Sequence, residues 1–179
     1  MSAFEFSLIP IAIIIGFAIT QLLSLWASLI RNWQTTSHPG FYLSISLWLL
    51  AALLVHFTGL WGYREVPFGS FGALLLVIAP TLFFMLSVSV LTPTNNELSG
   101  NLSDSYFARC RSVLILAALA SALSGVPDLL PGVLSAPDPW LLLIYVVPLA
   151  VLAFTSNRAI HAVGHVVLWL IIIVTQFVI

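Results

Sequence analysis

The sequence has very little charge and contains no lysine. Only 6% of its residues are charged, whereas a soluble domain carries about 25%. All five basic residues are arginines, so no side-chain amine is present to form a Schiff base with retinal or another carbonyl compound. The formal net charge is −1, and no basic surface indicates nucleic acid. The lack of a basic surface excludes a nucleic-acid-binding protein, and the low content of charged residues argues against a soluble enzyme.

Cysteine is equally scarce. Cys110 is the one cysteine of the chain, so the sequence forms neither an intrachain disulfide nor a thiolate metal cluster. Apolar residues, by contrast, make up 61% of the sequence, and the mean hydropathy is +1.15. A chain of 179 residues holds several membrane spans of about 20 residues each and leaves little room for a soluble domain. The sequence therefore predicts an all-α, polytopic transmembrane helix bundle.

The apolar runs predict about six transmembrane helices in a single domain that covers residues 1–179. We expect spans at about 6–30, 41–60, 71–91, 105–126, 140–154 and 157–179. Ser103 or Asp104 is the expected N-cap of the fourth span. Small residues four apart in that span, Ala117, Ser121 and Gly125, favour a central and closely packed helix. The proline-rich linker 127–139 is expected to lie at the membrane interface without crossing.

The arginines predict an orientation for this bundle. Loops one, three and five hold four of the five, and loop two holds only Arg64, beside Glu65. The positive-inside rule then places loops one, three and five in the cytoplasm and both termini on the outer side. A small, arginine-oriented, multi-span chain resembles many bacterial inner-membrane proteins, and we expect that location. The four arginines of the odd-numbered loops are Arg31, Arg109, Arg111 and Arg158.

The last apolar segment carries a stripe of polar and aromatic side chains. At about 100° per residue, the members of the stripe fall within an arc of roughly 80° on one helix face. Polar side chains in such a helix face protein, water or a ligand rather than lipid. We therefore expect a buried polar seam that starts at the cytoplasmic face and faces segment two or four. Its members are Arg158, His161, His165, Trp169 and Gln176.

His161 and His165 are four residues apart, which is the spacing of a two-histidine metal site on one helix face. A metal needs further ligands, and no carboxylate lies within the hydrophobic part of any segment. The favoured interpretation is a neutral histidine pair that hydrogen-bonds to a serine, a threonine or a backbone carbonyl on a neighbouring helix. We expect no metal site and no catalytic residue.

A haem would need His56 as its second axial ligand. His56 lies about fifteen residues from the cytoplasmic end of segment two, or roughly 22 Å, whereas His165 lies about eight residues, or roughly 12 Å, from the same side. Axial ligands of one haem lie at similar depth, so this offset argues against the pairing. The sequence therefore predicts no cofactor.

Arg109 and Arg111 lie in the first turns of segment four. The simplest interpretation is that they anchor the helix at the cytoplasmic face. The alternative is that Arg109, Arg111 and Arg158 together hold the headgroup of an anionic lipid or ligand.

These patterns favour a non-enzymatic membrane protein that acts through helix packing, as an accessory, sensor or interaction subunit. The alternative is an oligomeric channel or transporter lined by Arg158, His161, His165 and Gln176. A redox subunit that binds haem or quinone is a lower alternative. The expected partners are the lipid bilayer and either a second copy of the chain or another membrane protein, and no nucleic acid.

Overall fold

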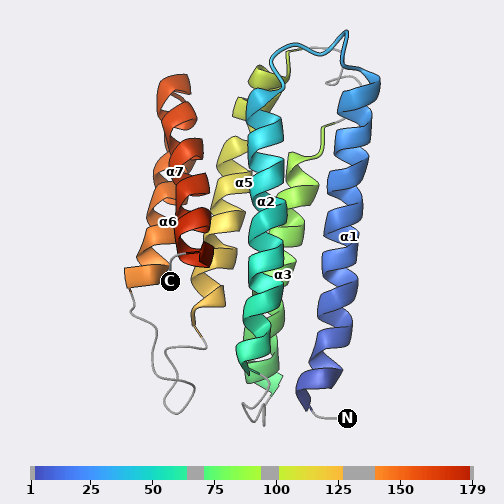
Figure 1. Cartoon of the computed structure of the whole chain (residues 1–179), viewed down its shortest axis with the longest axis vertical. Helices are drawn as coiled ribbons and strands as arrows, with labels where there is room; N and C mark the ends of the chain where they lie inside the picture. Colours follow the sequence, from blue (N-terminus) through green and yellow to red (C-terminus); the bar gives the residue numbers. More distant parts are fainter. Residues whose placement is uncertain (1–2, 64–70, 94–100, 127–139, 178–179) are drawn as a thin grey trace.

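The computed structural model shows long helices that run antiparallel to one another (Figure 1). It describes residues 3–63, 71–93, 101–126 and 140–177, and these form no strand beyond one isolated bridge. A short 3₁₀ helix, η1 (Leu60–Tyr63), follows the second long helix. The long helices are α1 (Ala3–Arg31), α2 (Gly40–Gly59), α3 (Phe71–Leu91), α5 (Leu102–Ser124), α6 (Trp140–Ala153) and α7 (Arg158–Phe177).

Within these described residues, five helices are long and apolar enough to cross a membrane. The sixth, α6, has 14 residues and rises about 21 Å, less than the roughly 30 Å of a hydrocarbon core. The fold is thus all-helical and suited to a multi-pass membrane protein, while the sixth span and the sides of the termini stay predictions. The predicted interfacial linker 127–139 and Arg64 lie outside the described residues. The five apolar stretches are Glu5–Arg31, Gly40–Gly62, Leu74–Leu91, Leu102–Ser124 and Arg158–Gln176.

The start of α5 differs from the sequence prediction. Asn101 is the N-cap, because its side-chain oxygen accepts a hydrogen bond from the backbone N–H of Ser103 at 3.1 Å. The prediction that Ser103 or Asp104 caps the helix is therefore wrong, and the helix begins at Leu102 rather than at Ser105. Asp104 instead lies in the first turn, where its charge complements the positive end of the helix dipole.

The helix α5 is the central one of the bundle. It packs most extensively against α3 and α6 and also contacts α2. Ala117 and Ala120 are fully buried on it, and such small side chains let helix backbones approach closely in membranes. The last helix, α7, packs against α6 and α2 and lies at the edge of the bundle beside α6 (Figure 1). Buried Trp48 of α2 fixes it there by donating from Nε1 to the carbonyl oxygen of Leu168 at 3.2 Å.

The antiparallel order brings the carboxy-terminal ends of α1, α3 and α6 to one end of the bundle, the upper end in Figure 1. At this end the backbone N–H of Leu102 donates to the carbonyl oxygen of Ser37 at 3.2 Å, which ties the first loop to the start of α5. His38 follows with a positive φ of 53°, a backbone conformation that is uncommon for a residue other than glycine. Arg31 ends α1 and Arg158 begins α7 at the same end. We call it the arginine-rich end.

Candidate functional site

The histidine pair of α7 meets a tyrosine from α5. The hydroxyl oxygen of Tyr106 lies 3.0 Å from Nδ1 of His161 and 2.9 Å from Nε2 of His165. The exposed fractions of Tyr106, His161 and His165 are 0%, 0% and 6%. The four-residue spacing places both imidazole rings on one face of α7, and α5 places the hydroxyl between them. The pair thus hydrogen-bonds to a neighbouring helix, but through a tyrosine hydroxyl rather than the serine, threonine or backbone carbonyl that the sequence favoured.

One backbone carbonyl fixes the direction of these hydrogen bonds. Nε2 of His161 lies 3.0 Å from the carbonyl oxygen of Thr155, which can only accept, so Nε2 carries a hydrogen. His161 has no carboxylate partner in the described part of the chain, and a buried charge without one is strongly unfavourable, so we assign the neutral ring.

Nδ1 of neutral His161 then accepts the hydrogen of the Tyr106 hydroxyl. The Tyr106 oxygen in turn accepts from Nε2–H of His165. The hydrogen bonds therefore run one way, from His165 through Tyr106 and His161 to Thr155. We call these four residues the His–Tyr–His chain.

Aromatic rings hold the His–Tyr–His chain in place. The ring of Phe41 stacks on Tyr106 with 5.3 Å between centroids and 13° between planes, and it meets His165 edge-on at 5.5 Å. On the other histidine, Phe107 meets the ring of His161 edge-on at 4.9 Å. Stacked and edge-to-face arrangements are the favourable geometries for such rings. The rings of α2 and α5 therefore hold both imidazoles in their present orientation.

A pocket of about 590 Å³ opens beside His165, between the first turns of α2 and those of α7. Its two walls are linked by a hydrogen bond from Nε1 of Trp169 to Oγ of Ser44 at 3.4 Å. Val166 and Leu170 line it too and are 59% and 53% exposed, so the pocket continues into the apolar outer face of α7. Arg158 and His38 line the opposite part, at the arginine-rich end.

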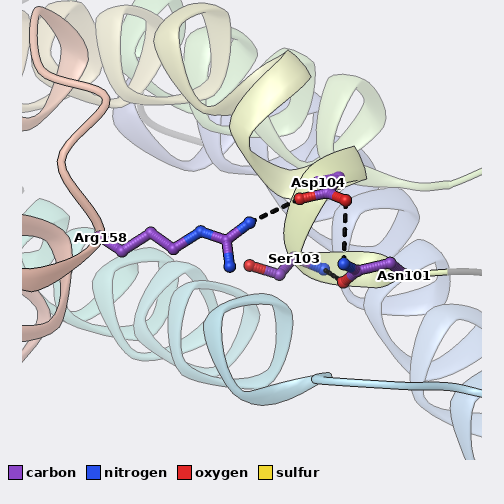
Figure 2. Close-up of polar contacts among 4 residues, drawn as sticks. All are labelled: Asn101, Ser103, Asp104 and Arg158. Atoms are coloured by element: carbon purple, nitrogen blue, oxygen red, sulfur yellow. Dashed lines mark hydrogen bonds and ion pairs between the residues drawn. The ribbon is translucent and has the colours of Figure 1, made fainter.

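Arg158 is held by an ion pair at the mouth of this pocket. Its Nη2 lies 2.7 Å from Oδ1 of Asp104, and the two side chains are 62% and 64% exposed. Figure 2 shows Arg158 reaching from α7 to the first turn of α5, where Nδ2 of Asn101 donates to Oδ2 of the same carboxylate at 2.9 Å. The charge of Arg158 is thus compensated by an aspartate that the sequence analysis had considered only as a helix cap.

The other two arginines of the predicted anion site have different partners. Arg109 donates from Nη1 to the carbonyl oxygen of Thr92 at 2.9 Å. The guanidinium carbon of Arg111 lies 5.2 Å from the ring centroid of Phe154, within range of a cation–π contact. These contacts hold each helix end to its neighbour. Arg158 lines the pocket beside His165, whereas Arg109 and Arg111 do not.

His56 and Gln176 do not join the histidine pair. Nε2 of His56 lies 3.0 Å from Oγ1 of Thr81, and Nδ1 of the same ring lies 3.1 Å from Oγ of Ser124. It lines a separate cavity of about 110 Å³, which shares no lining residue with the larger pocket. Gln176 is exposed. The buried part of the predicted seam therefore comprises His161 and His165, with Trp169 half-buried, and does not extend along the whole of α7.

The role of Tyr106 was not predicted from the sequence. The residue lies eleven positions, or about three helical turns, before Ala117, so it shares a face with the small residues of α5. This spacing is the signal that would have placed it inside the bundle. The neighbouring Arg109 and Arg111 obscured the signal, because they indicated a cluster at the membrane interface. Nothing comparable marked Thr155, which acts through its backbone.

In the part of the chain that the structure describes, no three histidine, cysteine, aspartate or glutamate side chains gather as metal ligands. Comparison with protein-family models, with curated proteins and with solved structures gave no match to this chain. A function must therefore be argued from the site itself.

Proposed function

We propose that this protein is a non-enzymatic membrane protein that binds a small amphipathic molecule between α2 and α7, as a sensor or accessory subunit. The pocket carries this proposal. Its volume of about 590 Å³ lies in the range of small-molecule sites, roughly 300–1,000 Å³. Its wall changes from polar His165 and Arg158 to apolar Val166 and Leu170. An amphipathic molecule has the same division.

The arrangement of the other polar groups favours binding over transport. A transport path through the bundle needs polar groups that follow one another across the membrane. Here the pocket beside His165 and the cavity beside His56 have no lining residue in common, and Gln176 is exposed. Imidazole rings fixed by hydrogen bonds and aromatic contacts suit a preformed binding site.

The position of α7 supports a sensing role. This helix packs against α2 and α6 at the edge of the bundle (Figure 1), and the pocket lies along its contact with α2. A ligand that binds there more tightly when α7 is displaced from α2 would shift the helix toward the displaced position. A partner that touches the outer face of α7 would then detect the ligand.

Labelling with a photoreactive amphiphile tests the binding proposal. The full-length protein in lipid nanodiscs is irradiated with a diazirine-bearing dodecanol, and the labelled peptides are mapped by mass spectrometry. Ala162→Phe fills the pocket from α7, and Ala12→Phe is the matched control, because Ala12 is also exposed but lies on α1. We expect Ala162→Phe to reduce labelling of the pocket at least about fivefold, a difference of about 1 kcal/mol, and Ala12→Phe to leave it unchanged. Equal labelling of all three proteins would contradict the proposal.

A further inference from the structure

We infer that the ligand of this pocket is an uncharged lipid-soluble alcohol whose hydroxyl group donates a hydrogen bond to Nδ1 of His165. This inference rests on the proposed binding function and names the chemical class of the ligand. It follows from the tautomer of His165, from the ion pair at the mouth of the pocket and from the apolar wall beyond.

The tautomer of His165 determines which ligand group can bind to its free nitrogen. The Thr155 carbonyl sets the direction of every bond in the His–Tyr–His chain and requires His165 to donate from Nε2. Nδ1 of the neutral ring then holds a lone pair and is the nitrogen that remains for a molecule in the pocket, which His165 lines. A ligand group next to it must therefore donate a hydrogen. A carboxylate, an ether or a ketone cannot do so.

The charge beside the pocket favours a neutral headgroup. Arg158 lines the pocket, and its charge is neutralised by Asp104 across 2.7 Å. An anionic headgroup would have to compete with Asp104 for the guanidinium, and a cationic headgroup would have to compete with Arg158 for the carboxylate. A neutral headgroup leaves the ion pair intact. This is why the structure favours an alcohol over the anionic lipid that the arginines alone had indicated.

The residues around the pocket suit both the hydroxyl group and the apolar chain of an alcohol. The oxygen of an alcohol also accepts, and Ser44 on the α2 wall can donate, since its own oxygen accepts the N–H of Trp169. The apolar part of the ligand would lie along Val166 and Leu170, which are exposed on the outer face of α7. An amphiphile could thus enter from the lipid without crossing a polar barrier.

Three photoreactive probes of the same length test the inference: dodecanol, its methyl ether and dodecanoate, each with the same diazirine. Labelling is carried out on the full-length protein in nanodiscs at about pH 9, where a carboxyl group is ionised. We expect the alcohol to label the pocket about tenfold more than the ether or the carboxylate. Equal labelling of the pocket by all three overturns the choice of an alcohol and leaves the binding proposal standing. Labelling of the pocket no stronger than that of the lipid-facing side of α1 overturns both.

Tyr106 should act as a positioning residue for this ligand. In Tyr106→Phe the acceptor for Nε2–H of His165 is lost, so the imidazole is free to take the other tautomer. We expect the alcohol-to-ether labelling ratio to fall toward one because ether labelling rises, since Nδ1–H of the other tautomer would donate to the ether oxygen as readily as to the hydroxyl oxygen. Tyr145→Phe is the control, because Tyr145 bonds to Thr175 and lines the smaller cavity. An unchanged ratio in Tyr106→Phe overturns the role of the tautomer.

The wild-type protein gives a second readout that does not depend on the folding of a variant. The ¹⁵N chemical shifts of His165, obtained from histidine-labelled protein in nanodiscs, distinguish a protonated ring nitrogen from one with a lone pair. We expect a hydrogen on Nε2 and a lone pair on Nδ1, with the Nδ1 signal moving on addition of dodecanol and not of its ether. A hydrogen on Nδ1 overturns the inference.

Discussion

Tyr106 is the residue on which the two histidines of α7 depend. Its single hydroxyl satisfies Nδ1 of His161 and Nε2 of His165, and all three groups are buried. Removal of the hydroxyl would leave one buried acceptor and one buried donor without partners. Such groups destabilise a fold because they have lost their hydrogen bonds to water and gained none in return.

We predict that Tyr106→Phe lowers the free energy of unfolding by about 1–2 kcal/mol, at the upper end for interhelical hydrogen bonds in membranes. The measurement is reversible unfolding in mixed micelles of mild detergent and dodecyl sulfate. Tyr145→Phe is the matched control. Its partner Thr175 keeps a hydrogen bond to the carbonyl oxygen of Ile171 at 2.8 Å, so we expect a loss of at most about 0.6 kcal/mol. Equal losses of unfolding free energy in the two variants would show that the His–Tyr–His chain adds little to the stability of the fold.

At the scale of residues, the sequence predicted the histidine pair but not its partner. The spacing of His161 and His165 sufficed to place both on one helix face, because the geometry of a helix is local. The partner of the pair could not be assigned in the same way. Tyr106 is 55 residues from His161, and only the packing of α7 near α5 brings them together. The ion pair of Arg158 with Asp104 likewise depends on where two helices begin.

At the scale of elements, α7 approaches α6 closely at Gly164. A Cβ atom added there would lie less than 3.0 Å from side-chain carbons of Leu152, which is itself 1% exposed. Because Gly164 has no side chain, α7 can pack closely against α6 next to the His–Tyr–His chain. Gly16 of α1 has no atom within 4 Å of such a Cβ. The two glycines therefore have different structural roles.

We predict that Gly164→Ala destabilises the protein by about 1–2 kcal/mol, because overpacking of a filled interface forces side chains or helices to move. Gly16→Ala should be neutral or slightly stabilising, because alanine favours a helix over glycine by up to about 1 kcal/mol. Unfolding in mixed micelles measures both. Adding Leu152→Ala to Gly164→Ala should cause less further loss than Leu152→Ala does in the wild type, since the two side chains compete for one space. Strictly additive losses would contradict the proposed contact.

The elements were largely predictable, whereas their contacts were not. Long apolar runs predict helices because every backbone polar group in lipid must be satisfied within its own segment. Apolar periodicity, however, does not reveal which face of such a helix meets another helix. Val151 and Leu152 are adjacent aliphatic residues of α6, yet one is 55% exposed and the other 1%. Lipid tails and a protein core are both apolar, so both surfaces select the same residue types.

For the whole molecule, the structure separates two ends of different character. The arginine-rich end holds the loop after α1, the start of α5 and the start of α7, joined by the Ser37–Leu102 hydrogen bond and the Arg158–Asp104 ion pair. The pocket opens near this end. The amino-terminal turns of α1 lie at the other end (Figure 1). If the arginine bias sets the orientation, the polar mouth of the pocket faces the cytoplasm while its apolar wall faces lipid.

Single cysteines test this orientation. In a Cys110→Ser background the chain carries no other thiol, and exposed positions at the two ends, Glu5 and Gln34, can each be changed to cysteine. Glu5 lies in the first turns of α1, and Gln34 follows its last turn at the arginine-rich end. In sealed right-side-out vesicles we expect a membrane-impermeant maleimide to label Glu5→Cys at once and Gln34→Cys only after permeabilisation.

The reverse pattern would mean that the arginines face outward and that a ligand in the pocket reports on the outer medium instead. Labelling of both cysteines from the same side would contradict a membrane-spanning α1, and with it the antiparallel order on which the pocket depends. The position of Glu5 and Gln34 on opposite sides follows from the 29 residues of α1, which at about 1.5 Å each exceed the thickness of a bilayer core. The choice of side follows from the arginine bias, and this labelling tests it.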